Sequence, residues 1–247
     1  MTLISLNIRS GGGNRVAAIR QFLESHRPDV IVLTEWRNNR CAYDFIAWMK
    51  SSGFLFYDAL SDGTTPNGIC VAARFRFEKT SMTPTPASSA GALMLARFQN
   101  WTLLACYFPQ DTAKGRFFSA CKEIAAVHSE TPFVILGDLN TGNQCADKSQ
   151  SGAPYACAAG FDALRSEAGL VDLWRHSNGP DAREWTWISN KNNGFRIDHA
   201  FGNEPFIRMF QPKCGYDHRP REEKFSDHSA LIVTRDLCDD VSAKSKN

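Results

Sequence analysis

Apolar and polar positions follow two different periods along this chain. Short apolar runs, typical of buried strands, recur from the first residues to the last part of the sequence. Between them lie longer stretches in which apolar residues return every three to four positions, the pattern of a helix that buries one face. This mixture predicts an α/β protein.

The predicted elements are numerous and short. Strands are expected at 3–8, 29–33, 54–58, 67–74, 92–98, 101–107, 133–136, 185–188, 195–201 and 228–234. Helices are expected at 14–26, 42–51, 113–128 and 161–168, and loops at 80–91 and 141–154. Many strands follow one another without a helix between them, so two packed sheets flanked by helices fit better than a βαβ alternation. We expect one domain, residues 1–237, and a polar C-terminal tail, residues 238–247.

Composition narrows the class of protein. The 247 residues are 43% hydrophobic with a formal net charge of +2, which indicates a globular chain and does not by itself indicate a nucleic-acid binder. No apolar run approaches the ~20 residues of a membrane span, and no signal peptide is visible. The eight cysteines form no CxxC pair, which argues against a zinc site. We therefore expect a cytoplasmic protein with no membrane partner.

Several familiar catalytic patterns are missing from the sequence. There is no GxSxG nucleophile motif, no GxxxxGK[ST] phosphate loop and no GxGxxG dinucleotide motif. These absences argue against serine-hydrolase, nucleoside-triphosphate and dinucleotide chemistry.

Polar residues at the ends of the predicted strands carry the candidate chemistry. They are Asn7, Glu35, Tyr107, Asp138, Asn140, Asp198, Asp227 and His228. Each has an ordinary explanation by itself: Asn7 could cap a turn, Asp138 could belong to a plain turn, and Asp198 could be a buried partner of Arg196. Together, hard oxygen ligands and one Asp–His pair are what metal-assisted phosphodiester hydrolysis needs.

The order of these motifs resembles a known family. SLN at 5–7, TE at 34–35, YFPQ at 107–110, GDLN at 137–140, RID at 196–198 and SDH at 226–228 resemble the endonuclease/exonuclease/phosphatase superfamily. The resemblance implies a four-layer α/β sandwich, with two mixed β-sheets packed face to face and flanked by helices. Within the superfamily, Tyr107 in YFPQ resembles the exonuclease III-like abasic-site endonucleases.

The resemblance also implies a role for each motif residue. Glu35, Asn7 and Asp227 lie at a Mg²⁺ site, for which Mn²⁺ is an alternative, with Asp138 and Asn140 beside it. Asp138 activates the attacking water, and Asn7 and Asn140 hold the phosphate. His228, oriented by Asp198, binds the phosphoryl oxygen, while Tyr107 contacts the phosphate or the leaving group.

A substrate-binding surface follows from the same resemblance. Gln110 contacts a flanking phosphate, and Trp187, Phe195 and Ile197 form an apolar pocket for a sugar without its base, unless they are ordinary strand residues. Arg196 is expected to contact the substrate. Other basic residues in or beside the motif loops favour a polyanion, although they could be a scattered solvated surface. They are Arg9, Arg15, Arg37, Arg40, Arg183, Lys191, Arg219, Arg221 and Lys224.

These observations predict a monomeric Mg²⁺-dependent phosphodiesterase acting on DNA, as an abasic-site endonuclease or 3′–5′ exonuclease in DNA repair. Two alternatives stay open. Glu35-Trp36-Arg37 replaces the usual Glu-Thr-Lys, and two loops are shorter than in exonuclease III. The substrate could therefore be RNA or a small phosphodiester. The other alternative is a non-catalytic nucleic-acid-binding module.

Overall fold

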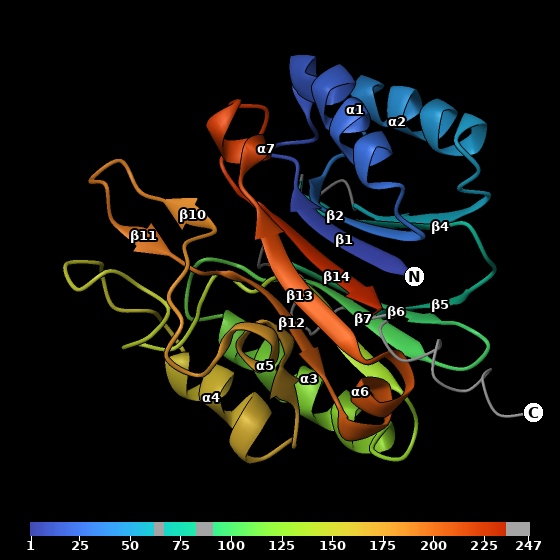
Figure 1. The fold of residues 1–247 in the computed structure, drawn as a ribbon. Coiled ribbons are helices and arrows are strands. Elements are labelled where there is room, and N and C mark those ends of the chain that lie inside the picture. The colour runs from blue at the N-terminus through green and yellow to red at the C-terminus, as the bar shows by residue number, and fades with distance from the viewer. Residues whose placement is uncertain (62–66, 83–90, 236–247) are drawn as a thin grey trace, which may run out of the picture.

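Two six-stranded sheets face each other in the computed structural model, which describes residues 1–61, 67–82 and 91–235 (Figure 1). The first sheet has the order β13 (Pro212–Asp217), β14 (Ala230–Arg235), β1 (Thr2–Asn7), β2 (Val30–Trp36), β4 (Gly68–Ala73) and β3 (Phe56–Leu60). The second has the order β5 (Glu78–Met82), β6 (Ala92–Arg97), β7 (Thr102–Tyr107), β8 (Phe133–Asp138), β12 (Asp198–Gly202) and β9 (Val171–Asp172). The pairs β1–β2 and β7–β8 are parallel and the other pairs antiparallel, so both sheets are mixed.

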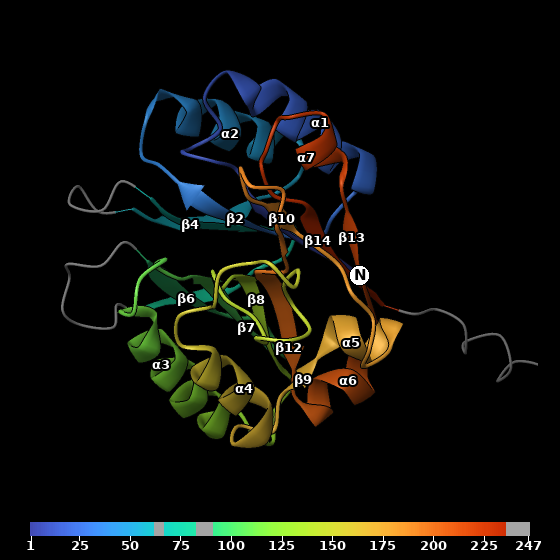
Figure 2. The same cartoon turned by 90° about the vertical axis from the view of Figure 1, so that its left-hand side faces the viewer.

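Helices cover the outer faces of both sheets, which gives the four layers visible in Figure 2. On the first sheet lie α1 (Val16–His26), preceded by a 3₁₀ turn at Gly13–Arg15, α2 (Arg40–Ser51) and the short α7 (Arg219–Glu222). On the side of the second sheet lie α3 (Lys114–Val127), α4 (Ala158–Ser166), α5 (Leu173–Asn178) and α6 (Glu204–Phe210). A small hairpin of β10 (Trp187–Ile188) and β11 (Gly194–Phe195) projects from one end.

Strand alternation produces a separate core on each side of a sheet. Val30 and Val32 of β2 face the second sheet, while Ile31 and Leu33 pack under the helices α1 and α2. A third apolar core joins β7 and β8 to α3 and α4. Because both faces of the central strands are buried, their ends are held rigidly, and polar side chains placed there keep a fixed geometry.

The predicted architecture is confirmed, and several details of the prediction are wrong. Residues 80–82 were expected in a loop but belong to β5, whose polar sequence becomes a strand through pairing with β6. The expected strand 195–201 divides at Arg196 into β11 and β12, which lie in different sheets. The elements α5, α6, α7, β9 and β13 were not predicted.

Parts of the prediction fall outside the described residues. They are 83–90 of the expected loop and the whole tail 238–247. Among the helices of the described residues, none combines the length and the apolar character that a membrane crossing requires.

Candidate active site

The polar ends of strands from both sheets meet at one edge of the sandwich. Asn7 ends β1, Tyr107 ends β7 and Asp138 ends β8, while Asp198 begins β12 and His228 precedes β14. The Asn7 amide links the two sheets, because its Nδ2 donates to Asp138 Oδ2 at 3.0 Å. The sequence motifs therefore come together into one site.

Glu35 enters this site through a bulge in β2. Thr34 pairs with Ile69 and Trp36 with Gly68, so Glu35 has no opposite residue, and its φ of 56° lies in the left-handed region. A bulge of this kind turns a side chain away from the regular alternation. Asn7 Nδ2 donates to Glu35 Oε1 at 3.2 Å, and the Ser10 amide donates to Glu35 Oε2 at 2.7 Å. The carboxylate is therefore fixed next to Asn7.

Asp138 is a buried carboxyl group whose protonation is finely balanced. Its side chain is 1% exposed. Burial and the negative charge of Asp198 raise the pKa of Asp138 to about 7, although His228 and hydrogen bonds from Asn140 N and Asn7 act in the opposite direction. A carboxyl group with a pKa near 7 can take and release a proton close to neutral pH, which suits a general base.

The turn that carries Asp138 needs a glycine before it. Gly137 has a φ of 152°, and a Cβ atom there would lie 1.9 Å from the carbonyl oxygen of Cys106 on the neighbouring strand. Asn140, with a φ of 47°, closes the turn by donating from Nδ2 to Phe108 O at 2.7 Å. The GDLN motif is thus a tight turn that projects Asp138 and Asn140 from the sheet edge.

Asp198 and His228 form a buried acid–histidine pair. His228 Nδ1 lies 2.9 Å from Asp198 Oδ2, and the two residues are 5% and 1% exposed. Burial lowers the pKa of His228, but the charge and hydrogen bond of Asp198, with smaller effects of Asp138 and Asp227, raise it to about 10. His228 is therefore an imidazolium at neutral pH and can donate from Nε2 to an anionic oxygen.

Tyr107 and Asp227 complete the predicted set. The Tyr107 phenol is buried, and burial together with the charges of Glu35 and Asp138 raises its pKa, so it is a hydrogen donor at neutral pH. Asp227 is half-buried beside His228, and its charge acts on Arg15 together with that of Glu35. Phenol, imidazolium and carboxylates thus surround one small volume.

The predicted substrate-binding residues have different surroundings. Gln110 is exposed, just beyond β7. Trp187 pairs with Phe195 in the hairpin, with ring centroids 5.7 Å apart, and it also forms a β-bridge to His228. Ile197 is 6% exposed between Phe195 and Asp198. The hairpin therefore carries an aromatic pair directly beside the Asp198–His228 pair.

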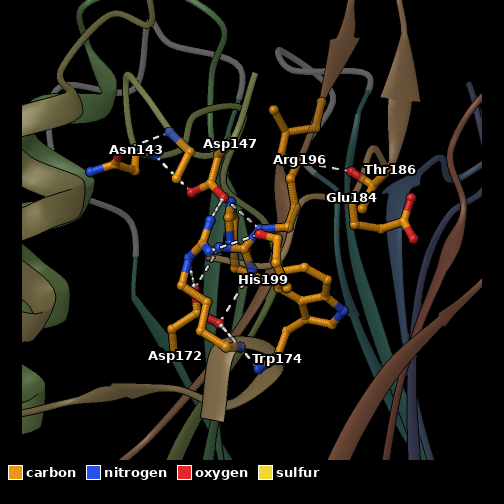
Figure 3. A network of polar contacts seen from close by, with 12 residues as sticks. Asn143, Asp147, Asp172, Trp174, Glu184, Thr186, Arg196 and His199 are labelled. Atoms are coloured by element: carbon orange, nitrogen blue, oxygen red, sulfur yellow. Dashed lines mark hydrogen bonds and ion pairs between the residues drawn. The ribbon is translucent and has the colours of Figure 1, made fainter. Parts of the chain in front are cut away.

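Arg196 does not have the surroundings of a substrate-binding residue (Figure 3). It is 0% exposed, and its guanidinium donates to Asp147 Oδ1 at 2.7 Å and to Asp172 Oδ2 at 2.5 Å. Arg175 pairs with the same two carboxylates, and the Trp174 ring lies 4.8 Å from the Arg196 guanidinium carbon. This burial leaves Arg196 no exposed surface with which to contact a substrate, contrary to the expectation from the sequence. Through these pairs Arg196 connects the loop of Asp147 and the N-cap of α5, Asp172, to the segment that leads into β12.

Lys114 lies at the site although it belongs to none of the sequence motifs. Lys114, at the start of α3, is 1% exposed and donates from Nζ to Asn140 O at 2.5 Å. Burial lowers the pKa of Lys114, and the charge of Asp138 acts against that decrease. The sequence shows only a lysine in the first turn of an amphipathic helix, and a lysine at such a position is ordinarily solvated. It therefore gave no indication that Lys114 belongs to the site.

Among the described residues, one group of acidic and histidine side chains lies close enough together to hold a divalent ion. Asp138, Asp198 and His228 each bring a ligand atom within 4.8 Å of the others. His228 is an imidazolium whose Nδ1 is already bonded to Asp198, so it is a poor ligand. Glu35, Asn7 and Asp227 offer oxygen atoms only, which fits a hard cation such as Mg²⁺ better.

Comparisons with known proteins agree with this geometry. The family model of the endonuclease/exonuclease/phosphatase family matches residues 4–228. A comparison with curated proteins found no match. Among solved structures, an AP endonuclease from Archaeoglobus fulgidus is similar with a TM-score of 0.77 and 17% identity, over 96% of this chain and 100% of the other.

A second solved structure has the same fold. Truncated TDP2 from Caenorhabditis elegans is similar with a TM-score of 0.66 and 15% identity, over 94% of this chain and 95% of the other. At these identities the two structures establish the sandwich fold, while the family model covers nearly the whole chain and all of the motifs. The chain therefore belongs to the endonuclease/exonuclease/phosphatase family, and it is an enzyme of the phosphodiesterase and nuclease kind that this family comprises.

Proposed function

We propose that this enzyme hydrolyses phosphodiester bonds in DNA with Mg²⁺, as an exonuclease III-like abasic-site endonuclease or 3′–5′ exonuclease in DNA repair. The observation that carries the proposal is the connected set Glu35–Asn7–Asp138 next to the buried Asp198–His228 pair. In this proposal the set supplies a metal-binding carboxylate, a base and a cationic hydrogen donor.

Each residue has a distinct task in this proposal. Glu35 and Asp227 would hold the ion with Asn7, and a bound Mg²⁺ would supply positive charge for the phosphoryl and leaving oxygens. Asp138, with its pKa of about 7, accepts a proton from the attacking water. The His228 imidazolium donates to the phosphoryl oxygen as negative charge develops there. Tyr107 donates to the phosphate or the leaving oxygen, and Asn140 helps to hold the phosphate.

Support for a DNA substrate comes from the hairpin and from the similar structures. The AP endonuclease that this chain resembles is named for abasic sites, and the Trp187–Phe195 pair beside His228 suits a sugar that has lost its base. Gln110, exposed beyond Tyr107, suits a flanking phosphate. We further propose that residues 1–237 act as one monomeric domain in the cytoplasm.

A small phosphodiester or RNA remains the second candidate. The observation that favours it is the short β10–β11 hairpin, which has two residues in each strand and offers little surface for a long duplex. With Mn²⁺ in place of Mg²⁺, the same oxygen ligands would serve.

The experiment compares three end-labelled substrates. They are a duplex with one abasic-site analogue, the undamaged duplex and a single-stranded RNA, each with Mg²⁺ or with EDTA. The proposal predicts a metal-dependent cut at the abasic position. An intact abasic duplex together with cleaved RNA would assign the site to the second candidate.

A further inference from the structure

The Tyr107 hydroxyl has a partner outside all of the motifs. Asn67, the residue before β4, donates from Nδ2 to the Tyr107 hydroxyl oxygen at 3.4 Å, a long hydrogen bond. On the other side of the amide, Arg37 Nε donates to Asn67 Oδ1 at 2.6 Å. A polar chain therefore runs from Arg37, just after the end of β2, to the phenol in the active site.

The direction of each hydrogen bond in this chain follows from chemistry. A guanidinium can only donate, so the Asn67 group that faces Arg37 must be the carbonyl oxygen. The NH₂ group of Asn67 then faces Tyr107, and the phenolic oxygen must accept. With that position taken by the amide, the hydroxyl proton of Tyr107 must point away from Asn67, and the charges of Glu35 and Asp138 act on the same phenol.

The backbone holds Arg37 in position for this role. Gly11, with a φ of 75°, donates from its amide to Glu35 O at 2.8 Å, and a Cβ atom on Gly11 would lie only 3.0 Å from Arg37 Cβ. The glycine turn after β1 therefore packs against the stem of Arg37. Arg37 is half-buried, which limits the positions that its guanidinium can take.

We propose that Asn67, held by Arg37, is a positioning residue that directs the Tyr107 hydroxyl proton toward the phosphoryl group of the bound phosphodiester. This inference rests on the proposed role of Tyr107 as a donor to the phosphate or the leaving oxygen. It also gives a function to Arg37, whose guanidinium holds the Asn67 amide.

The test is a double-mutant cycle between Asn67→Asp and Tyr107→Phe. Aspartate keeps the shape of Asn67 and an acceptor for Arg37 but lacks the NH₂ donor. Initial rates are measured with bis(p-nitrophenyl) phosphate and Mg²⁺, a small substrate that needs no DNA contacts. We expect Asn67→Asp to lower kcat about tenfold with little change in KM, and to lower it less than about twofold in the Tyr107→Phe background.

A matched control and a second readout make the result decisive. Asn38→Asp, the same change at an exposed position beside Arg37, should leave kcat unchanged. Equal effects of Asn67→Asp with and without the Tyr107 hydroxyl would overturn the inference. Because the probe is not DNA, this cycle can be measured even if the enzyme does not cut abasic DNA. Failure of the proposed DNA substrate and failure of the role of Asn67 therefore give different results.

If the small ester is not cleaved, side-chain amide NMR decides. The Asn67 NH₂ resonances should shift in Tyr107→Phe while those of Asn38 stay in place. Unmoved Asn67 resonances would refute the contact.

Discussion

Removing the charge of Asp198 should change the protonation of His228, and Asp198→Asn does this with almost no change in shape. In the wild-type protein, His228 Nδ1 lies 2.9 Å from Asp198 Oδ2, and both side chains are buried. Among the groups that raise the pKa of His228, Asp198 is the largest contributor, while burial favours the neutral ring. The variant keeps the burial and loses the main source of stabilisation of the imidazolium.

The size of the effect follows from the pKa of His228. The pKa rises from 6.5 to about 10 in the folded protein, and this difference corresponds to roughly 5 kcal/mol in favour of the charged ring. Without Asp198, we expect the pKa of His228 to fall below about 7. At pH 8 the wild-type ring is then an imidazolium and the variant ring is neutral, so kcat should fall on the order of 100-fold.

Imidazole NMR of the metal-free protein between pH 5 and 8.5, with one further spectrum at pH 9, measures this directly. The wild-type His228 signals should show a protonated ring across the range, and the variant should titrate within it. The imidazole signals of His176, which is exposed on α5, serve as an internal reference because the substitution should not change them. A wild-type His228 that titrates near 6.5, or a variant ring still protonated at pH 9, would refute the reasoning.

Three further predictions concern residues around the site. Arg196→Met should lower the unfolding free energy measured in urea by about 3–5 kcal/mol, since it leaves Asp147 and Asp172 buried without this partner. Arg208→Met, which removes an exposed pair with Glu204, should lower it by under about 0.5 kcal/mol. Similar losses in the two variants would contradict this account. Burial, followed by the charge of Arg196, lowers the pKa of His199 to about 4. Its contribution to stability is therefore complete above pH 6.5 and is lost as pH falls toward 4. The unfolding free energy of His199→Gln minus that of the wild type should increase by about 2 kcal/mol from pH 7 to pH 5. The titration of Asp138, which has the opposite effect, is common to both proteins and cancels in this subtraction. A pH-independent difference would argue against the prediction. Lys114→Met should lower kcat about tenfold and destabilise the protein by about 1–3 kcal/mol, because Asn140 O loses its donor. Lys122→Met, on the same helix, should change neither quantity. A Lys114→Met enzyme with the wild-type kcat would show that Lys114 has no role in the site.

The site residues that could be predicted from the sequence are those at strand ends. Asn7, Glu35 and Asp138 follow buried apolar runs, and the ends of parallel neighbouring strands meet at one edge of a sheet. The meeting of Asn7 with Glu35 could therefore be expected from the pattern, whereas the approach of Asp138 depends on how the two sheets face each other. The bulge that turns Glu35 inward could not be expected, because it depends on the pairing of β2 with β4.

Errors arose where a residue's partner lies far away in the chain. Arg196 stands two positions before Asp198, which suggested either a pair with Asp198 or a contact with substrate. Its actual partners, Asp147 and Asp172, are 49 and 24 residues away, and Asp198 pairs with His228 instead. The contact of Asn67 with Tyr107 could not be predicted for the same reason, since the two residues are 40 positions apart.

Elements missed in the fold have weak local signals. Strand β13, PKCGYD, begins with proline and contains glycine, and Cys214 and Tyr216 give it only a short alternation, yet it pairs along its whole length with β14. The helices α5 and α6 span six and seven residues, too few for a helical period to stand out. Such segments take their structure from packing at the edge of the sandwich rather than from their own propensity.

The most direct test of the central claim is single-turnover cleavage of the abasic-site duplex by Asp138→Asn. The substitution keeps the buried shape and removes the proposed base. With Mg²⁺ present, the account predicts that cleavage is lost by at least about 100-fold while the affinity for the duplex, measured separately, stays within a few-fold of wild type. Cleavage by Asp138→Asn at the wild-type rate would contradict the assignment of this site as the catalytic centre.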